Sequence, residues 1–113
     1  MGNNAKSSKA KGRRLQNFVI DKLRDLFTSL EPDDIKSQTM GMTGEDIVLS
    51  PAARKKIPYS IECKNVEKLN IWSALQQSED NCNDMTPAVI FKRNHSNTYV
   101  AIPFDHFIEL IGD

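Results

Sequence analysis

The chain has 113 residues, with 15 basic and 15 acidic side chains and a formal net charge of zero at pH 7. This length suits one domain with a single hydrophobic core. The balanced charge argues against a uniformly basic nucleic-acid coat. No apolar run could span a membrane, and the N-terminus has no signal-peptide core, so we expect a cytosolic protein without a membrane partner.

The two cysteines, Cys63 and Cys82, match no zinc-ligand spacing and form no disulfide framework. Free thiols are therefore predicted.

Positive charge is concentrated at the N-terminus. Residues 1–14 carry five basic side chains and no acidic one, so the remaining chain is net acidic. We expect residues 1–13 to be a flexible basic arm, followed by one domain over residues 14–113. The arm could contact nucleic acid, or it could be a solubilising tail.

Helical periodicity starts after this arm. Seven apolar side chains recur at spacings of three and four, which predicts one buried helical face that ends before Pro32. They are Leu15, Phe18, Val19, Leu23, Leu26, Phe27 and Leu30.

Two short apolar segments then predict strands, "DIVLS" at residues 46–50 and "IPYSIECKN" at residues 57–65. The basic segment "PAARKK" between them fits an exposed connector, so an antiparallel hairpin is expected. A helix over residues 71–83 would bury Ile71, Trp72 and Leu75, with Cys82 as a further candidate for its buried side.

The chain ends with two further predicted strands, "PAVIFKR" and "TYVAIP", and a short helix stopped by Gly112. The pattern α-β-β-α-β-β-α predicts a mixed α/β or α+β domain, with one small sheet flanked by helices.

The strand segment "SIECKN" carries the candidate site. Alternate strand residues share a face, so Glu62 and Lys64 lie side by side while Cys63 points to the other face. The pair could be an ordinary ion pair on a wet sheet face. A hairpin would also bring Asp46 near Glu62, and two adjacent carboxylates favour a hard divalent cation such as Mg²⁺ between them.

Asp46 followed by Glu62-Cys63-Lys64 resembles the D…ExK signature of the PD-(D/E)XK nuclease superfamily. The opening "KAKGRRLQ" and the segment "ECKNVEKLNIWSALQQ" are similar to those of its small phage-type and Holliday-junction resolvase-like members. The resemblance covers residues 9–111 and implies the restriction-endonuclease-like αβββαβ core.

The resemblance also implies roles for individual residues. Asp46, Glu62 and the main-chain carbonyl of Cys63 would hold Mg²⁺ or Mn²⁺, and Lys64 would be the catalytic lysine. Gln77, rather than Gln76, would face the site from the following helix. Many relatives have a glutamate in the first helix where this chain has Gln16, which leaves the number of metal ions open.

A nuclease of this kind would act on DNA as a homodimer, in the host cytoplasm if it is phage-encoded. Branched DNA such as a Holliday junction is the first substrate class that the resemblance suggests. Candidate nucleic-acid-binding residues are Lys11, Arg13, Arg14, Gly44, Lys92 and Arg93.

Several residues also have simpler explanations. Lys92 and Arg93 could simply be solvated, and Gly44 could simply terminate a helix or strand without contacting DNA. His95 and His106 are expected to be structural. Trp72 could stack on a base, but it is expected to lie in the core or at a dimer interface. A non-catalytic nucleic-acid-binding module, or an interaction protein with an acidic body, remain alternatives to the nuclease.

Overall fold

The computed structural model describes residues 4–39 and 44–113, with only the backbone described at residues 4–6. Helices and strands alternate along this part of the chain. In order they are α1 (Asn4–Leu26), the 3-10 turn η1 (Pro32–Asp34), β1 (Ile35–Ser37), β2 (Ile47–Leu49), α2 (Pro51–Lys56), β3 (Tyr59–Asn65), α3 (Ile71–Asn81), β4 (Thr86–Lys92), β5 (Tyr99–Ala101) and α4 (Phe104–Ile111).

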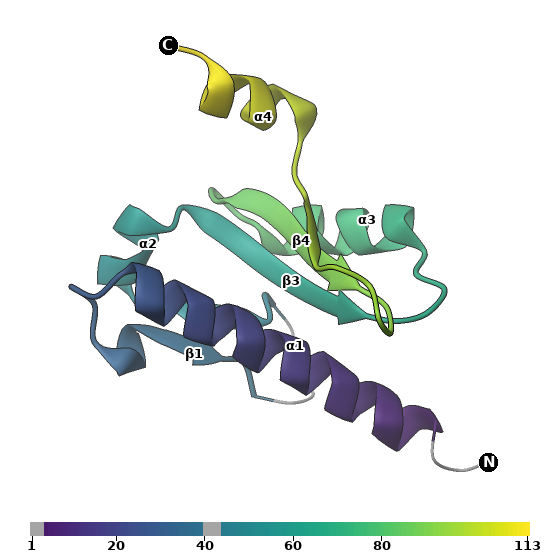
Figure 1. The fold of residues 1–113 in the computed structure, drawn as a ribbon. Coiled ribbons are helices and arrows are strands. Elements are labelled where there is room, and N and C mark those ends of the chain that lie inside the picture. The colour runs from purple at the N-terminus through teal and green to yellow at the C-terminus, as the bar shows by residue number, and fades with distance from the viewer. Residues whose placement is uncertain (1–3, 40–43) are drawn as a thin grey trace.

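The main sheet has the strand order β3-β4-β5 (Figure 1). Strands β3 and β4 are parallel, with Glu62 beside Val89 and Cys63 beside Ile90, and helix α3 connects them. Strand β5 returns antiparallel to β4. This is the mixed sheet flanked by helices that the sequence predicted, so the predicted fold class is confirmed.

The two faces of β3 have different surroundings. Ile61 and Cys63 belong to the hydrophobic core, together with Leu15 and Val19 of α1. Ser60 and Glu62 face the other way and hydrogen-bond to Asn81 of α3. The predicted separation of Cys63 from Glu62 is therefore confirmed, and α1 and α3 cover opposite faces of the sheet.

The predicted hairpin is wrong. Strand β2 pairs with β1, a strand that sequence patterning did not identify, in the register Ile35 to Leu49. Residues 51–56 form helix α2, because Ser50 caps it by accepting a hydrogen bond from the Ala53 amide, 3.1 Å away, and Pro51 suits its first turn.

The N-terminal segment also differs from the prediction. Helix α1 already begins at Asn4, so residues 4–13 are helical where an irregular arm was expected, and residues 1–3 lie outside the described part. Three lysines, two alanines and one arginine make up most of this segment, and all three residue types are strong helix formers. The basic side chains therefore belong to the first turns of a long helix, whose N-terminal end extends beyond the sheet (Figure 1).

Helices α3 and α4 bury less apolar surface than expected. In α3 the buried side chains are Ala74 and Ser78, and Trp72 is 78% exposed. The predicted burial of Trp72 is wrong because the small side chains of this helix face the sheet. Helix α4 has no buried residue and stands away from the main sheet (Figure 1).

No helix in the described ranges is long and apolar enough to cross a membrane.

The β1–β2 sheet supplies two fully buried residues of the core, Ile35 and Ile47. We expect Ile35→Ala to lower the free energy of unfolding by about 2–5 kcal/mol, because it leaves a cavity. The exposed Trp72→Ala should change the free energy of unfolding by only about 0.5 kcal/mol or less. Urea denaturation of both variants checks this, and equal effects would contradict the placement of β1 in the core.

Candidate active site

Asp46 is held against the free edge of β3. Its main-chain amide donates to the Ile61 carbonyl, 2.9 Å away, and its Oδ2 accepts from the Cys63 amide at 2.7 Å. The sequence predicted that Asp46 would lie near Glu62. This proximity is confirmed, although it arises through an edge contact and not through a hairpin turn.

Glu62 is a fully buried carboxylic side chain. Its Oε1 accepts a hydrogen bond from the Asn81 Nδ2 at 2.8 Å. Its Oε2 is also buried and has no hydrogen-bond partner among the described residues. A buried carboxylate oxygen without a partner is costly, which favours a proton or a cation beside it.

Burial, the largest cause, and the negative charge of Asp46 together raise the pKa of Glu62 to about 7, against the Asn81 hydrogen bond and the positive charge of Lys64. Near neutral pH this carboxyl therefore exchanges readily between its protonated and ionised forms. A divalent cation would favour the ionised form, because it supplies the missing partner charge.

An open hollow of about 450 Å³ is lined by Asp46 and by Asn81, the hydrogen-bond partner of Glu62, but not by Glu62 itself, and we call it the Asp46 hollow. Gly44, with a backbone φ of 106°, leads into Asp46 on one side, and this φ favours glycine. Helix α3 supplies the other wall with a polar stripe. The lining residues are Gly44, Asp46, Ser73, Gln76, Gln77, Asp80 and Asn81.

The structure thus brings together Asp46, Gly44 and Gln77, three of the residues singled out in the sequence. Gln76 lines the hollow too, and its Nε2 donates a hydrogen bond to Asp80 Oδ1 at 2.9 Å. The Gln77 amide takes no part in this hydrogen bond.

Lys64 and Cys63 complete the D…ExK segment. Lys64 is half-buried two residues beyond Glu62, on the same strand face, and it does not line the Asp46 hollow. Cys63 is buried, and this burial, followed by the charges of Asp46 and Glu62, raises the pKa of its thiol. The thiol is therefore a neutral core group. Since one residue's N–H and C=O point the same way in a strand, the Cys63 carbonyl lies on the edge that Asp46 occupies.

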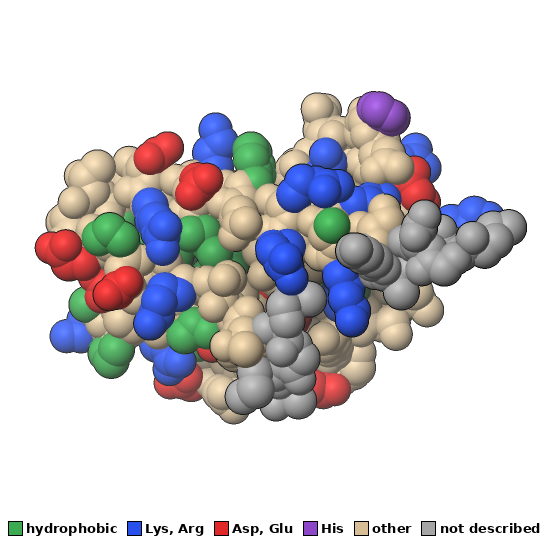
Figure 2. Space-filling view, turned by 90° about the horizontal axis from the view of Figure 1, so that it is seen from below, with side chains coloured by type: hydrophobic (Ala, Val, Ile, Leu, Met, Phe, Trp, Pro, Cys, Tyr) green, Lys and Arg blue, Asp and Glu red, His purple; other side chains and the backbone are tan. Residues whose placement is uncertain are grey.

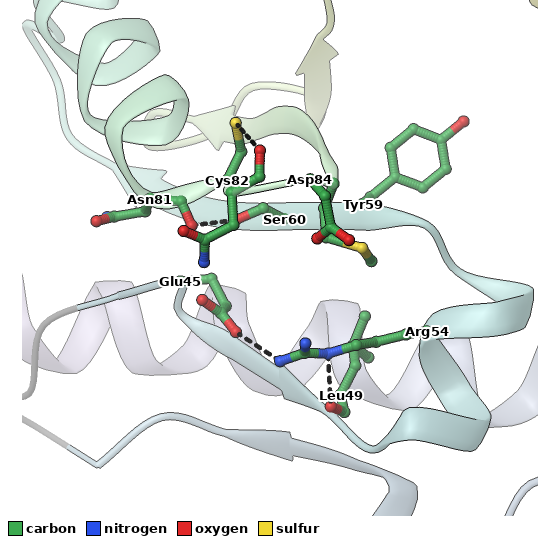
Figure 3. Close-up of a pocket in the computed structure, with 10 residues that line it drawn as sticks. Glu45, Leu49, Arg54, Tyr59, Ser60, Asn81, Cys82 and Asp84 are labelled. Carbon is green, nitrogen blue, oxygen red and sulfur yellow. Dashed lines mark hydrogen bonds and ion pairs between the residues drawn. The ribbon is translucent and has the colours of Figure 1, made fainter.

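The residues that line a neighbouring pocket make contacts that hold the chain around the site (Figure 3). Arg54 of α2 forms an ion pair of 3.9 Å with Glu45 and donates from its Nε to the Leu49 carbonyl. Ser60 Oγ donates to the main-chain carbonyl of Asn81 at 3.5 Å. These contacts hold the chain on either side of the pair Asp46 and Glu62.

The expected nucleic-acid-binding residues have different surroundings in the structure. Arg14 of α1 and Lys92 of β4 line a second hollow together with Asn65, which we call the Arg14 hollow. Lys11 instead pairs with Glu67, with 3.5 Å between Nζ and Oε2. Arg13 and Arg93 are exposed. Figure 2 shows basic side chains spread across one face of the molecule, with acidic side chains among them.

Sequence reasoning missed Asn81, the hydrogen-bond partner of Glu62. A signal was present, because Asn81 follows Gln77 by four residues and therefore lies on the same helix face. Gln16 is half-buried on α1 and does not line the Asp46 hollow. His106 binds the Tyr59 hydroxyl at 2.6 Å, as a structural contact.

A family model described as "Phage putative PDDEXK endonuclease" matches residues 7–112. The chain belongs to this family. Family membership confirms the resemblance that the D…ExK segment indicated and supports nuclease activity. No curated protein and no solved structure gave a match.

PDDEXK nucleases generally use divalent metals, and the residues present fit such an ion. Within the described ranges no group of three or more His, Cys, Asp and Glu side chains could hold a metal. Two carboxylates and a main-chain carbonyl form an all-oxygen set, which suits Mg²⁺ because this ion keeps several waters. The unpartnered Glu62 Oε2 is the specific observation that favours this fit.

The raised pKa of Glu62 gives a testable pH dependence of stability. The folded state keeps the Glu62 proton up to about pH 7. Below the unfolded-state pKa of about 4.5, the protonated carboxyl therefore makes its full contribution to the free energy of unfolding. It is lost as pH rises to about 7, and it amounts to about 3 kcal/mol. We expect wild type to lose stability relative to Glu62→Gln across this range, without metal.

Urea denaturation of both proteins in EDTA at several pH values measures this difference. Other titrating groups are common to both proteins and cancel. A difference that stays constant between pH 4.5 and pH 7 would contradict the assigned shift.

Proposed function

We propose that this protein is a metal-dependent endodeoxyribonuclease that hydrolyses phosphodiester bonds of DNA in the host-cell cytoplasm. The observation that carries the proposal is the pairing of Asp46 with the buried, half-partnered Glu62 beside the Asp46 hollow. A folded domain rarely keeps such a costly pair unless a ligand compensates it. Membership of the PDDEXK family supports the same chemistry.

Asp46, Glu62 and the Cys63 carbonyl are the proposed metal ligands. A bound Mg²⁺ supplies charge that polarises the phosphodiester and lowers the pKa of water. The protein's own part is positioning. The Cys63 amide fixes the Asp46 carboxylate, and Asn81 fixes one oxygen of Glu62 so that the other stays free for the cation.

Lys64 and Gln77 are the proposed catalytic side chains beyond the ligands. Lys64 shares a strand face with Glu62, and its ammonium group would stabilise negative charge developing on the scissile phosphate or orient the attacking water. Gln77 lies on the α3 wall of the hollow, where its amide can hydrogen-bond a water or a phosphate oxygen.

The proposed DNA contacts are the basic residues and the glycine named above. Arg14 and Lys92 come from different elements but line one hollow, so they could bind a single phosphate group. Gly44 would let the DNA backbone approach close to Asp46. The remaining proposed contacts are Lys11, Arg13 and Arg93.

Cleavage of DNA by purified protein with Mg²⁺ tests the catalytic proposal. We expect Lys64→Ala and Glu62→Gln each to lower the cleavage rate at least about 100-fold, because each removes charge acting directly at the reacting group. Binding of the same DNA should persist. The matched control is Lys36→Ala, an exposed lysine on β1, which should cleave normally.

Undiminished cleavage by both Lys64→Ala and Glu62→Gln would contradict this site. DNA binding without cleavage, in Mg²⁺ and in Mn²⁺, would instead identify a non-catalytic binding module. A panel of linear, nicked, flapped and four-way DNA then tests the proposed preference for branched substrates.

Metal binding can be measured without any reaction. Added Mg²⁺ should raise the melting temperature of the wild type at pH 8, because an ion that binds only the folded state stabilises it. Glu62→Gln should show a much smaller rise, since it removes one proposed ligand charge. Equal rises in both proteins would contradict Glu62 as a ligand, whatever their activity.

The Arg14 hollow gives a separate prediction on affinity. The double variant Arg14→Ala/Lys92→Ala should weaken DNA binding and reduce the salt dependence of log Kd by about one for each phosphate that the variant no longer neutralises. Fluorescence anisotropy at several salt concentrations measures the slope. The same slope as in wild type would exclude this hollow from the DNA interface.

A further inference from the structure

The C-terminal part of the chain exposes an unusual amount of apolar surface. Phe104 and Ile111 are 72% and 64% exposed, and the apolar side chains between them on α4 are all about half exposed. The helix contacts the rest of the domain through the hydrogen bond of His106 to Tyr59. An amphipathic helix of this kind is stable when its apolar face has a partner.

The same chain carries an unfilled apolar groove of about 320 Å³. It lies on the α1 face of the main sheet, where Ile61 and Ala88 form its floor and Leu23 and Phe27 form one wall. Leu110 of α4 reaches its rim. The volume is sufficient for several large side chains, which is more than the small voids of a packed protein interior provide.

We propose that α4 of a second copy of this chain fills the groove, and that the two copies exchange these helices reciprocally. The arrangement is two-fold symmetric, because each copy supplies one helix and one groove. It is independent of the catalytic proposal, since the groove lies on the sheet face opposite Glu62.

Charge complementarity favours this occupant. Helix α4 contains Asp105 and Glu109 and no lysine or arginine. Lys56 lines the groove, and the last turn of α2 that contains it is entirely basic. The net charge of zero means that two copies do not repel each other at long range.

The surface area is also sufficient. Covering the exposed apolar side chains of α4 would bury about 500 Å² in each copy, and the groove walls about as much again, which gives about 2,000 Å² across both copies. Stable protein interfaces have this size, whereas weak contacts are smaller.

Light scattering after size-exclusion chromatography, on the full chain without DNA, tests the proposal. The wild type should have twice the monomer mass of 12.8 kDa. Phe107→Asp should be a folded monomer by circular dichroism, because Phe107 is 46% exposed and outside the core. Trp72→Asp, an equally drastic change on an exposed side chain of α3, should remain a dimer.

A charge exchange distinguishes binding of a second copy's α4 from closure of α4 onto the groove of its own chain. The variants Lys55→Glu/Lys56→Glu and Asp105→Lys/Glu109→Lys should each be largely monomeric alone. Mixed in equal amounts, they should form a heterodimer, because both of its interfaces then join opposite charges. A monomeric wild type, a dimer that survives Phe107→Asp, or a mixture that stays monomeric would each overturn the proposal. Loss of cleavage with the dimer intact would concern only the catalytic proposal.

Discussion

The hydrogen bond from the Cys63 amide to the Asp46 carboxylate is the contact on which the proposed site depends. It fixes one acid at the edge of β3, next to the residue that follows the buried Glu62 in sequence. Two carboxylates so close together repel each other, and burial adds to the cost. This repulsion lowers the free energy of unfolding, and packing elsewhere in the domain must offset it, as is common at functional sites.

Strand β3 can carry this site because one of its faces packs into the core and the other faces α3. Ile61 and Cys63 pack into the core beneath α1, which anchors the strand. Glu62 and Lys64 then project toward the α3 side from a backbone that cannot shift easily. The parallel partner β4 and the crossover helix α3 follow from the same arrangement, because a parallel pair needs a long connection that covers one face.

The sequence predicted most of the site but less of the fold around it. The D…ExK segment predicted Asp46 and Glu62 as neighbours, because strand alternation is a local property, and the family resemblance added Gln77 on the following helix. Strand β1 has three residues and too little pattern to be identified, so β2 was assigned the wrong partner. The Asn81 bond to Glu62 depends on how α3 packs against the sheet, which no local pattern encodes.

The burial of α3 and α4 shows a further limit of periodicity. An apolar stripe predicts that a helix face will be covered, but it does not say by what. In α3 the sheet is approached by Ala74 and Ser78, so Trp72 is left outside. In α4 no side chain of the apolar stripe is fully buried by the described residues of its own chain. Since the groove and the Asp46 hollow lie on opposite sides of the sheet, a partner helix in the groove would stabilise β3 from the core side. The Asp46 hollow would remain open to DNA.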